Sequence, residues 1–152
     1  MEENTRLGQA FVLFGLLSVV GGVGLFVLTE AFAFEEGTFL TYRRVAVGLA
    51  GYGLPSFLHG IVLAAGGYSR AGEVGVVGVV LSALAVFAFF AAYPEGWSLA
   101  AEPTYVVGTL AVYGLGAMLG SFAAGGAMLA SRESDDDSAE ETGFIWGDPP
   151  TR

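Results

Sequence analysis

Four long apolar stretches, separated by short polar segments, constrain this chain more than any other feature. Each has about 20 residues or more, the length that a helix needs to cross the hydrocarbon core of a bilayer. The connections between them are short, so spans that are neighbours along the chain should lie antiparallel. The sequence therefore predicts an all-α polytopic membrane protein, a four-transmembrane-helix antiparallel bundle. The expected spans are about Gly8–Thr29, Val45–Gly67, Val74–Tyr93 and Tyr105–Ala130.

The chain has 152 residues, which leaves no room for a separate soluble domain beside four spans. We therefore expect one membrane domain over residues 1–130. After Ala130 the composition changes to Ser, Asp and Glu, with a run of acids at Asp135–Asp137. Because residues 131–142 have little apolar area to bury, we expect them to form a disordered acidic spacer. Residues 143–152 then form a short tail motif that contains three large apolar side chains, Phe144, Ile145 and Trp146.

The charged residues are unusual in kind, since all 6 basic residues are arginine and 15 acids give a formal net charge of -9. Dense carboxylates keep a surface hydrated where concentrated salt screens charge, so this balance is typical of a halophilic archaeon. The chain has no cysteine, which excludes disulfides, zinc–thiolate sites and iron–sulfur ligation. It also lacks the basic patch that nucleic-acid binding requires.

The arginines near the ends of the spans predict the orientation in the cell membrane. Four spans place both termini on one side, together with Arg6, Arg70 and Arg132. The other side has Arg43 and Arg44 near a span end. Cytoplasmic segments carry the excess of Lys and Arg, so the prediction is that both termini are cytoplasmic.

The second span contains a proline and the single histidine of the chain. Pro55 cannot donate a backbone hydrogen bond, which frees the carbonyl group of Gly51 and predicts a kink there. His59 lies in the middle of the span, where ionisable groups are candidates for function. A neutral histidine that packs and hydrogen-bonds within the bundle is the first interpretation. A small transporter that uses His59 for a proton or ligand is the alternative.

The sequence lacks the residues that most catalytic and transport mechanisms need. Drug/proton antiporters need a carboxylate inside the membrane, and no acid lies near the centre of a span. A nucleotide-binding loop of the G-x-x-x-x-G-K-[ST] type needs a lysine, and the chain contains none. The sequence shows no cluster of metal ligands and no arrangement of serine, histidine and aspartate for catalysis. We therefore expect no enzyme activity, no metal and no cofactor.

Three groups of residues are candidates for contacts with lipid, helices or partners. Gly116, Gly120 and Ala124 place small residues on one face of the fourth span, a pattern for close helix packing within the bundle or between copies in a homo-oligomer. Exposed aromatic residues in the tail are typical of anchors in protein interfaces. The expected interface anchors are Arg43, Arg44, Tyr93 and Trp97, and the expected partner-binding residues are Phe144, Ile145 and Trp146.

The segment from Arg43-Arg44-Val45 to Gly53-Leu54-Pro55, together with Tyr93-Pro94 and Trp97, resembles a haloarchaeal four-helix membrane family. That family is mostly uncharacterised, often carries a permease-like label and includes the membrane domain of the archaeal cell-division protein CdpA. The resemblance implies a membrane anchor whose cytoplasmic tail binds components of the division ring. It covers the second and third spans best.

These observations favour a non-catalytic integral membrane anchor or scaffold with a short cytoplasmic tail that binds a membrane or cytoplasmic protein partner. Cell division is the process that the resemblance implies. An accessory transmembrane subunit of a larger membrane complex, or the small transporter using His59, is the alternative.

Overall fold

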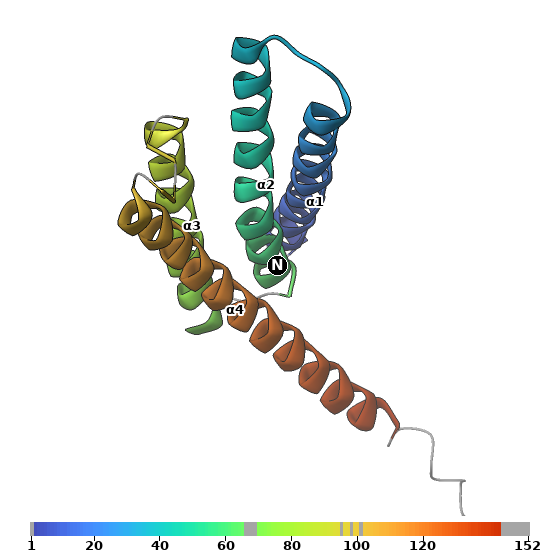
Figure 1. Ribbon diagram of the computed structural model, residues 1–152. Coiled ribbons are helices and arrows are strands. Elements are labelled where there is room, and N and C mark those ends of the chain that lie inside the picture. The colour runs from blue at the N-terminus through green and yellow to red at the C-terminus, as the bar shows by residue number, and fades with distance from the viewer. Residues whose placement is uncertain (1, 66–69, 95, 98, 101, 144–152) are drawn as a thin grey trace, which may run out of the picture.

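Four α-helices make up almost all of the structure (Figure 1). A computed structural model describes the backbone of residues 2–65, 70–94, 96–97, 99–100 and 102–143, and the side chains of these residues except 2–3, 70–71 and 133–143. The described backbone contains no strand. Each helix is long and apolar enough to cross a membrane, which confirms the predicted all-α fold with four spans. The helices are α1 (Glu2–Ala31), α2 (Glu36–Ala64), α3 (Arg70–Ala92) and α4 (Pro103–Gly143).

All four helices begin before the predicted spans, and α2 and α4 differ most from the prediction. Helix α2 begins at Glu36 rather than at Val45, so only four residues separate it from α1. Helix α4 continues through the acidic segment 131–142, which was expected to be disordered, and ends at Gly143. The expectation of disorder came from the lack of apolar area, which decides whether a segment folds by itself. Lengthening an existing helix is easier, because the cost of nucleation is already met and each residue adds a hydrogen bond.

The bundle consists of two helical hairpins rather than four equivalent helices. Helices α1 and α2 form one hairpin, α3 and α4 form the other, and α2 makes the contacts between the two. Among the described residues, α1 contacts no helix other than α2. Figure 1 shows the hairpins close together near the N-terminus of the chain and spread apart at their other end. This spread leaves the space that holds the candidate site.

The interface between α1 and α2 is a zipper of small residues spaced seven apart. Gly8, Gly15 and Gly22 of α1 face Gly60, Gly53 and Ala46 of α2 in antiparallel order. A methyl group added at Gly60 would lie 2.5 Å from the backbone nitrogen of Val12, and one at Gly22 would lie 2.6 Å from the carbonyl oxygen of Ala46. The two backbones are thus in direct contact, which is how helices associate where lipid removes the hydrophobic driving force.

The second hairpin uses the predicted small residues of α4. A methyl group added at Gly78 of α3 would lie 2.7 Å from the carbonyl oxygen of Gly116 and 2.8 Å from the nitrogen of Gly120. Ala124 belongs instead to a cluster between α4 and α2, in which Val62 is fully buried among Ala123, Ala124 and Ala127. The structure therefore places Gly116, Gly120 and Ala124 at contacts within one bundle.

Candidate functional site: an apolar cavity between the hairpins

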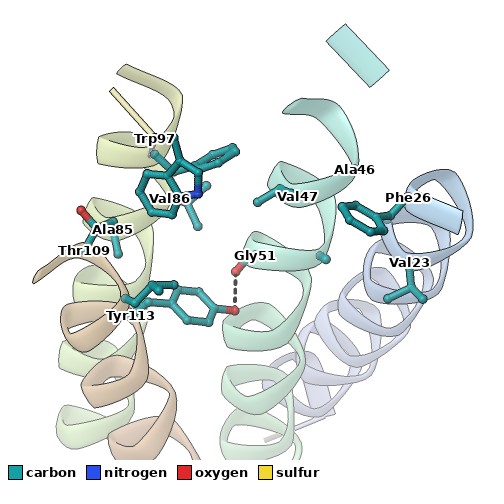
Figure 2. A pocket seen from close by; sticks show the side chains of 14 residues that line it. Val23, Phe26, Ala46, Val47, Gly51, Ala85, Val86, Trp97, Thr109 and Tyr113 are labelled. Atoms are coloured by element: carbon teal, nitrogen blue, oxygen red, sulfur yellow. Dashed lines mark hydrogen bonds between the residues drawn. The ribbon is translucent and has the colours of Figure 1, made fainter. Parts of the chain in front are cut away.

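A cavity of about 340 Å³ lies where the two hairpins spread apart. All four helices and the connection between α3 and α4 contribute to its walls (Figure 2). This volume is in the range of small-molecule sites, about 300–1,000 Å³. The lining residues are almost all apolar. They are Gly22, Val23, Phe26, Ala46, Val47, Ala50, Gly51, Ala85, Val86, Phe89, Trp97, Thr109, Leu110 and Tyr113.

A hydrogen bond between the two hairpins lies at the floor of the cavity. Figure 2 shows the hydroxyl group of Tyr113 on α4 pointing at the backbone carbonyl of Gly51 on α2, to which it donates at 3.1 Å. Gly51 lies four residues before Pro55, so its carbonyl has no backbone N–H partner within the helix. Tyr113 supplies the missing donor from a different helix. The proline thereby creates a polar attachment point for the second hairpin inside an apolar region.

Aromatic rings form the wall next to the connection between α3 and α4. The ring of Phe89 lies 4.9 Å from that of Trp97 in an edge-to-face arrangement and 4.9 Å from that of Tyr93. The backbone after α3 folds back in a tight turn, in which the N–H of Trp97 donates to the carbonyl of Pro94. The peptide bond between Tyr93 and Pro94 is cis. These contacts hold Trp97 over the cavity.

Arg44 joins the two hairpins next to the cavity, although it is not one of the lining residues. Its guanidinium donates from Nη2 to the carbonyl of Tyr93, just after the last residue of α3, and lies 5.8 Å from the centre of the Tyr93 ring. A cation is favoured there, because the free carbonyls at a helix C-terminus carry partial negative charge. Arg44 lies about one helical turn before Val47, which lines the cavity. A cationic group therefore lies about one helical turn from a residue that lines the cavity.

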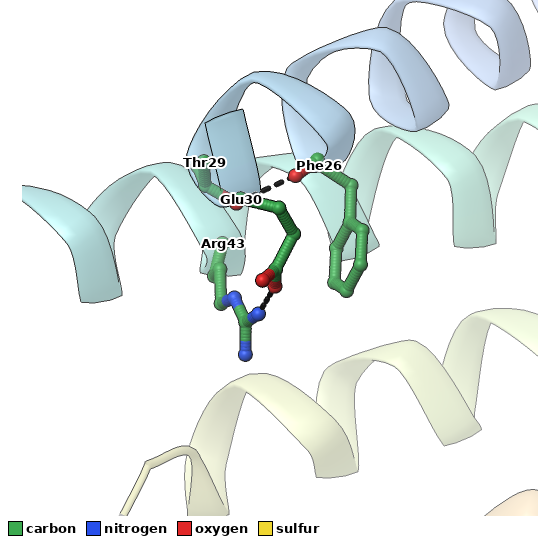
Figure 3. A network of polar contacts seen from close by, with 4 residues as sticks. All are labelled: Phe26, Thr29, Glu30 and Arg43. Atoms are coloured by element: carbon green, nitrogen blue, oxygen red, sulfur yellow. Dashed lines mark hydrogen bonds and ion pairs between the residues drawn. The ribbon is translucent and has the colours of Figure 1, made fainter. Parts of the chain in front are cut away.

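The contacts of Arg43 that the structure describes all lie within the first hairpin. Figure 3 shows its ion pair with Glu30 near the C-terminal end of α1, beside Phe26 and Thr29. The guanidinium also lies over two rings, 4.9 Å from the centre of Phe26 and 4.5 Å from that of Phe39. Glu30 thus neutralises Arg43, whereas Arg44 has no carboxylate partner among the described residues.

His59 lies away from the cavity, nearer the other end of the bundle. Its ring meets that of Phe11 of α1 edge to face at 6.0 Å, and Gly75 of α3 lies on another side of it. Its Nδ1 is buried and has no hydrogen-bond partner, and Ser56 donates to the carbonyl of Tyr52 instead of to the histidine. Among the described residues, no group of three or more His, Cys, Asp or Glu side chains could hold a metal ion.

The structure brings some of the predicted residues together and separates others. Arg44 contacts Tyr93, and the rings of Tyr93 and Trp97 both pack against Phe89 in the cavity wall. Pro55 acts on the floor of the cavity through Gly51. Phe144, Ile145 and Trp146 lie outside the described residues. Sequence reasoning missed Tyr113, although a carbonyl freed by a proline is a signal to search the facing spans for a hydroxyl donor.

A comparison with known protein families found one match. Residues 1–137 match the family model described as cell division protein A, N-terminal domain. No curated protein matched the chain, and no solved structure matched it. The match includes all four spans and the beginning of the acidic segment. The chain therefore belongs to the family of cell division protein A N-terminal domains, which confirms the resemblance seen in its second and third spans.

Proposed function

We propose that this protein is a non-catalytic membrane anchor in cell division, which presents a short cytoplasmic tail to a protein partner. The observation that carries the proposal is the continuity of α4. It runs without a break from Pro103, at the start of the fourth span, to Gly143 at the start of the tail motif. A helix that leaves the membrane in this way holds whatever follows it at a defined distance from the bilayer.

The length of α4 gives that distance. The part that could span the membrane ends at Arg132. The residues from there to Gly143 add about 17 Å at the helical rise of 1.5 Å per residue. Phe144, Ile145 and Trp146 follow directly, and large aromatic residues are common anchors in protein interfaces. In this proposal they bind a division-ring component, or another protein of the division site, beyond the head groups.

The arrangement of the helices supports a common side for both termini. The N-terminus and the projecting end of α4 lie at the same end of the bundle in Figure 1. Arg6 and Arg132 are at that end, and Arg43 and Arg44 are at the other. We assign the first end to the cytoplasm, because cytoplasmic segments carry the excess of basic residues.

Replacing the tail residues tests partner binding. The variant carries Phe144→Ala, Ile145→Ala and Trp146→Ala, and the matched control carries Ser134→Ala, Ser138→Ala and Thr142→Ala. Membranes from cells that express each tagged chain are solubilised in mild detergent, and division-ring proteins that co-purify are measured by mass spectrometry. The expected result is loss of these proteins with the tail variant and retention with the control. Both chains should stay in the membrane during alkaline extraction. Equal capture by the two chains would rule out the tail as the binding motif.

A role as an accessory transmembrane subunit is the second candidate, and the exposure of α1 favours it. Its outer face includes Gly21 and Gly24, which have no atom within 4 Å of an added methyl group. Small residues of this kind allow a helix of another protein to approach closely. A stoichiometric complex that survives mild detergent, and that Gly21→Leu disrupts, would support this role over the tail-binding anchor.

A further inference from the structure

The cavity between the hairpins opens toward the lipid. Val23 and Phe26 of α1 and Leu110 of α4 line it, and their side chains are between 40% and 55% exposed in the isolated chain. The opposite walls are closed, since Ala46, Ala85 and Phe89 are at most 4% exposed. In a membrane, the exposed edges face acyl chains. An apolar group can therefore enter sideways from the bilayer without crossing water.

The polar groups of the cavity restrict what can occupy it. The lining contains three polar side chains, those of Trp97, Thr109 and Tyr113. The hydroxyl of Tyr113 already donates to Gly51. A ligand with polar groups at both ends would leave those groups unpaired, which is costly in an apolar site. A plain hydrocarbon chain meets no such cost, and it restores the dispersion contacts that an empty apolar space lacks.

A positive charge, that of Arg44, lies near the outer end of the cavity. Arg44 lies about one turn beyond Val47 and bonds only to a neutral carbonyl, so its positive charge is not balanced by a described carboxylate. The next cation, Arg43, is balanced by Glu30. Arg44 is therefore a cation without an ion-pair partner among the described residues, about one helical turn from a residue that lines an apolar cavity. This combination complements a lipid with an apolar chain and an anionic head group.

We propose that this cavity binds one hydrocarbon chain of an anionic membrane lipid, whose head group pairs with Arg44. The lipid fills the space between the hairpins at the end where, among the described residues, Arg44 and Tyr113 make the polar bonds across it. It thereby joins α1 and α2 to α3 and α4. This inference is independent of the tail motif, because it concerns the opposite end of the bundle.

Trp97 lines the cavity and provides the probe for the test. The chain has 2 tryptophans, so Trp146→Phe leaves Trp97 as the single emitter. This full-length chain is reconstituted in vesicles of phosphatidylcholine with a fixed fraction of phosphatidylglycerol. Bromine, which quenches tryptophan, is placed on the acyl chains of one lipid or the other. Quenching should indicate a preference for the anionic lipid of roughly two- to fivefold, the range that a partly exposed ion pair supplies.

Two pairs of variants separate the cavity from general effects of the bilayer. Arg44→Gln should abolish the preference, whereas Arg6→Gln, at the other end of the bundle, should keep it. Val47→Phe fills the cavity and should reduce the preference, whereas Val107→Phe places the same ring on a side chain that is 56% exposed and lines no described cavity. Helical content by circular dichroism verifies that each variant is folded.

Four results would overturn the proposal. The first is equal quenching by the two lipids in the parent chain. The second is a preference that survives Arg44→Gln. The third is a preference that Val47→Phe and Val107→Phe reduce by the same amount. Native mass spectrometry of the detergent-purified chain identifies the occupant directly. A bound mass that belongs to a non-lipid molecule, or to a lipid without an anionic head group, would also contradict it.

Discussion

Two neighbouring glycines of α1 have opposite surroundings, which makes them a matched test of how the first hairpin is held together. Gly22 is buried against α2. A methyl group there would lie 2.6 Å from both the carbonyl oxygen of Ala46 and the nitrogen of Ala50. Gly21 points away from α2, and a methyl group there would have no atom within 4 Å. Gly22→Ala and Gly21→Ala therefore make the same chemical change on adjacent residues.

The geometry sets the size of the effect. Ordinary contacts of a methyl group begin near 3.4 Å, so Gly22→Ala must separate α1 from α2 by about 0.8 Å. The atoms that it meets belong to the backbone and cannot turn aside as a side chain would. A gap of that size forfeits about a quarter to a half of the affected contact energy. We expect a loss of about 1–3 kcal/mol in the free energy of unfolding, the usual cost of overpacking.

Gly21→Ala should have no cost and should stabilise the helix by up to about 1 kcal/mol, because alanine loses less backbone entropy than glycine. The measurement is the unfolding free energy in mixed micelles, followed by helical circular dichroism as a denaturing detergent replaces a mild one. If the two variants change stability equally, or if Gly21→Ala is the more damaging, contact between the backbones is not what holds the hairpin together.

Three other predictions follow from the site. Tyr113→Phe should cost about 1 kcal/mol of unfolding free energy, because it removes the donor to the carbonyl that the proline frees. In a Pro55→Ala background the same change should cost much less, since the new backbone N–H bonds that carbonyl; an equal cost in both backgrounds would contradict this assignment. For the orientation, Gly37→Cys should react with a membrane-impermeant maleimide in intact right-side-out vesicles, whereas Ser134→Cys should react only after permeabilisation. The reverse pattern would place the termini outside. His59→Leu should leave both membrane insertion and partner capture unchanged, as expected of a packing residue, and loss of capture with normal insertion would assign the histidine a functional role.

The helices could be predicted because their signal is local. Long runs of Gly, Ala, Val, Leu and Phe without charge have one stable form in a bilayer, in which each backbone group is bonded within its own helix. The ends of the helices were harder to predict. Glu36 and the acidic residues after Arg132 lie where both helix and irregular backbone can be solvated, so composition alone does not decide between them. The structure extends the helix in both places.

The candidate site was only partly predictable, for a different reason. The sequence indicated Pro55 and the free carbonyl of Gly51, and it placed Arg44, Tyr93 and Trp97 near span ends. It did not indicate that Tyr113 meets that carbonyl, since the two residues are 62 positions apart in the chain. The seven-residue spacing of Gly8, Gly15 and Gly22 was a signal for the packed face of α1 that the sequence reasoning did not use.

The sequence by itself thus determined the all-α class, the number of helices that could span a membrane and the family to which the chain belongs, because these depend on composition and on short segments. Only the tertiary structure decided that the bundle divides into two hairpins and that a cavity lies between them. Both features depend on how the faces of separate helices meet. In lipid those faces are selected by close packing of small residues and a few hydrogen bonds, not by the apolar pattern, which is nearly uniform around each helix.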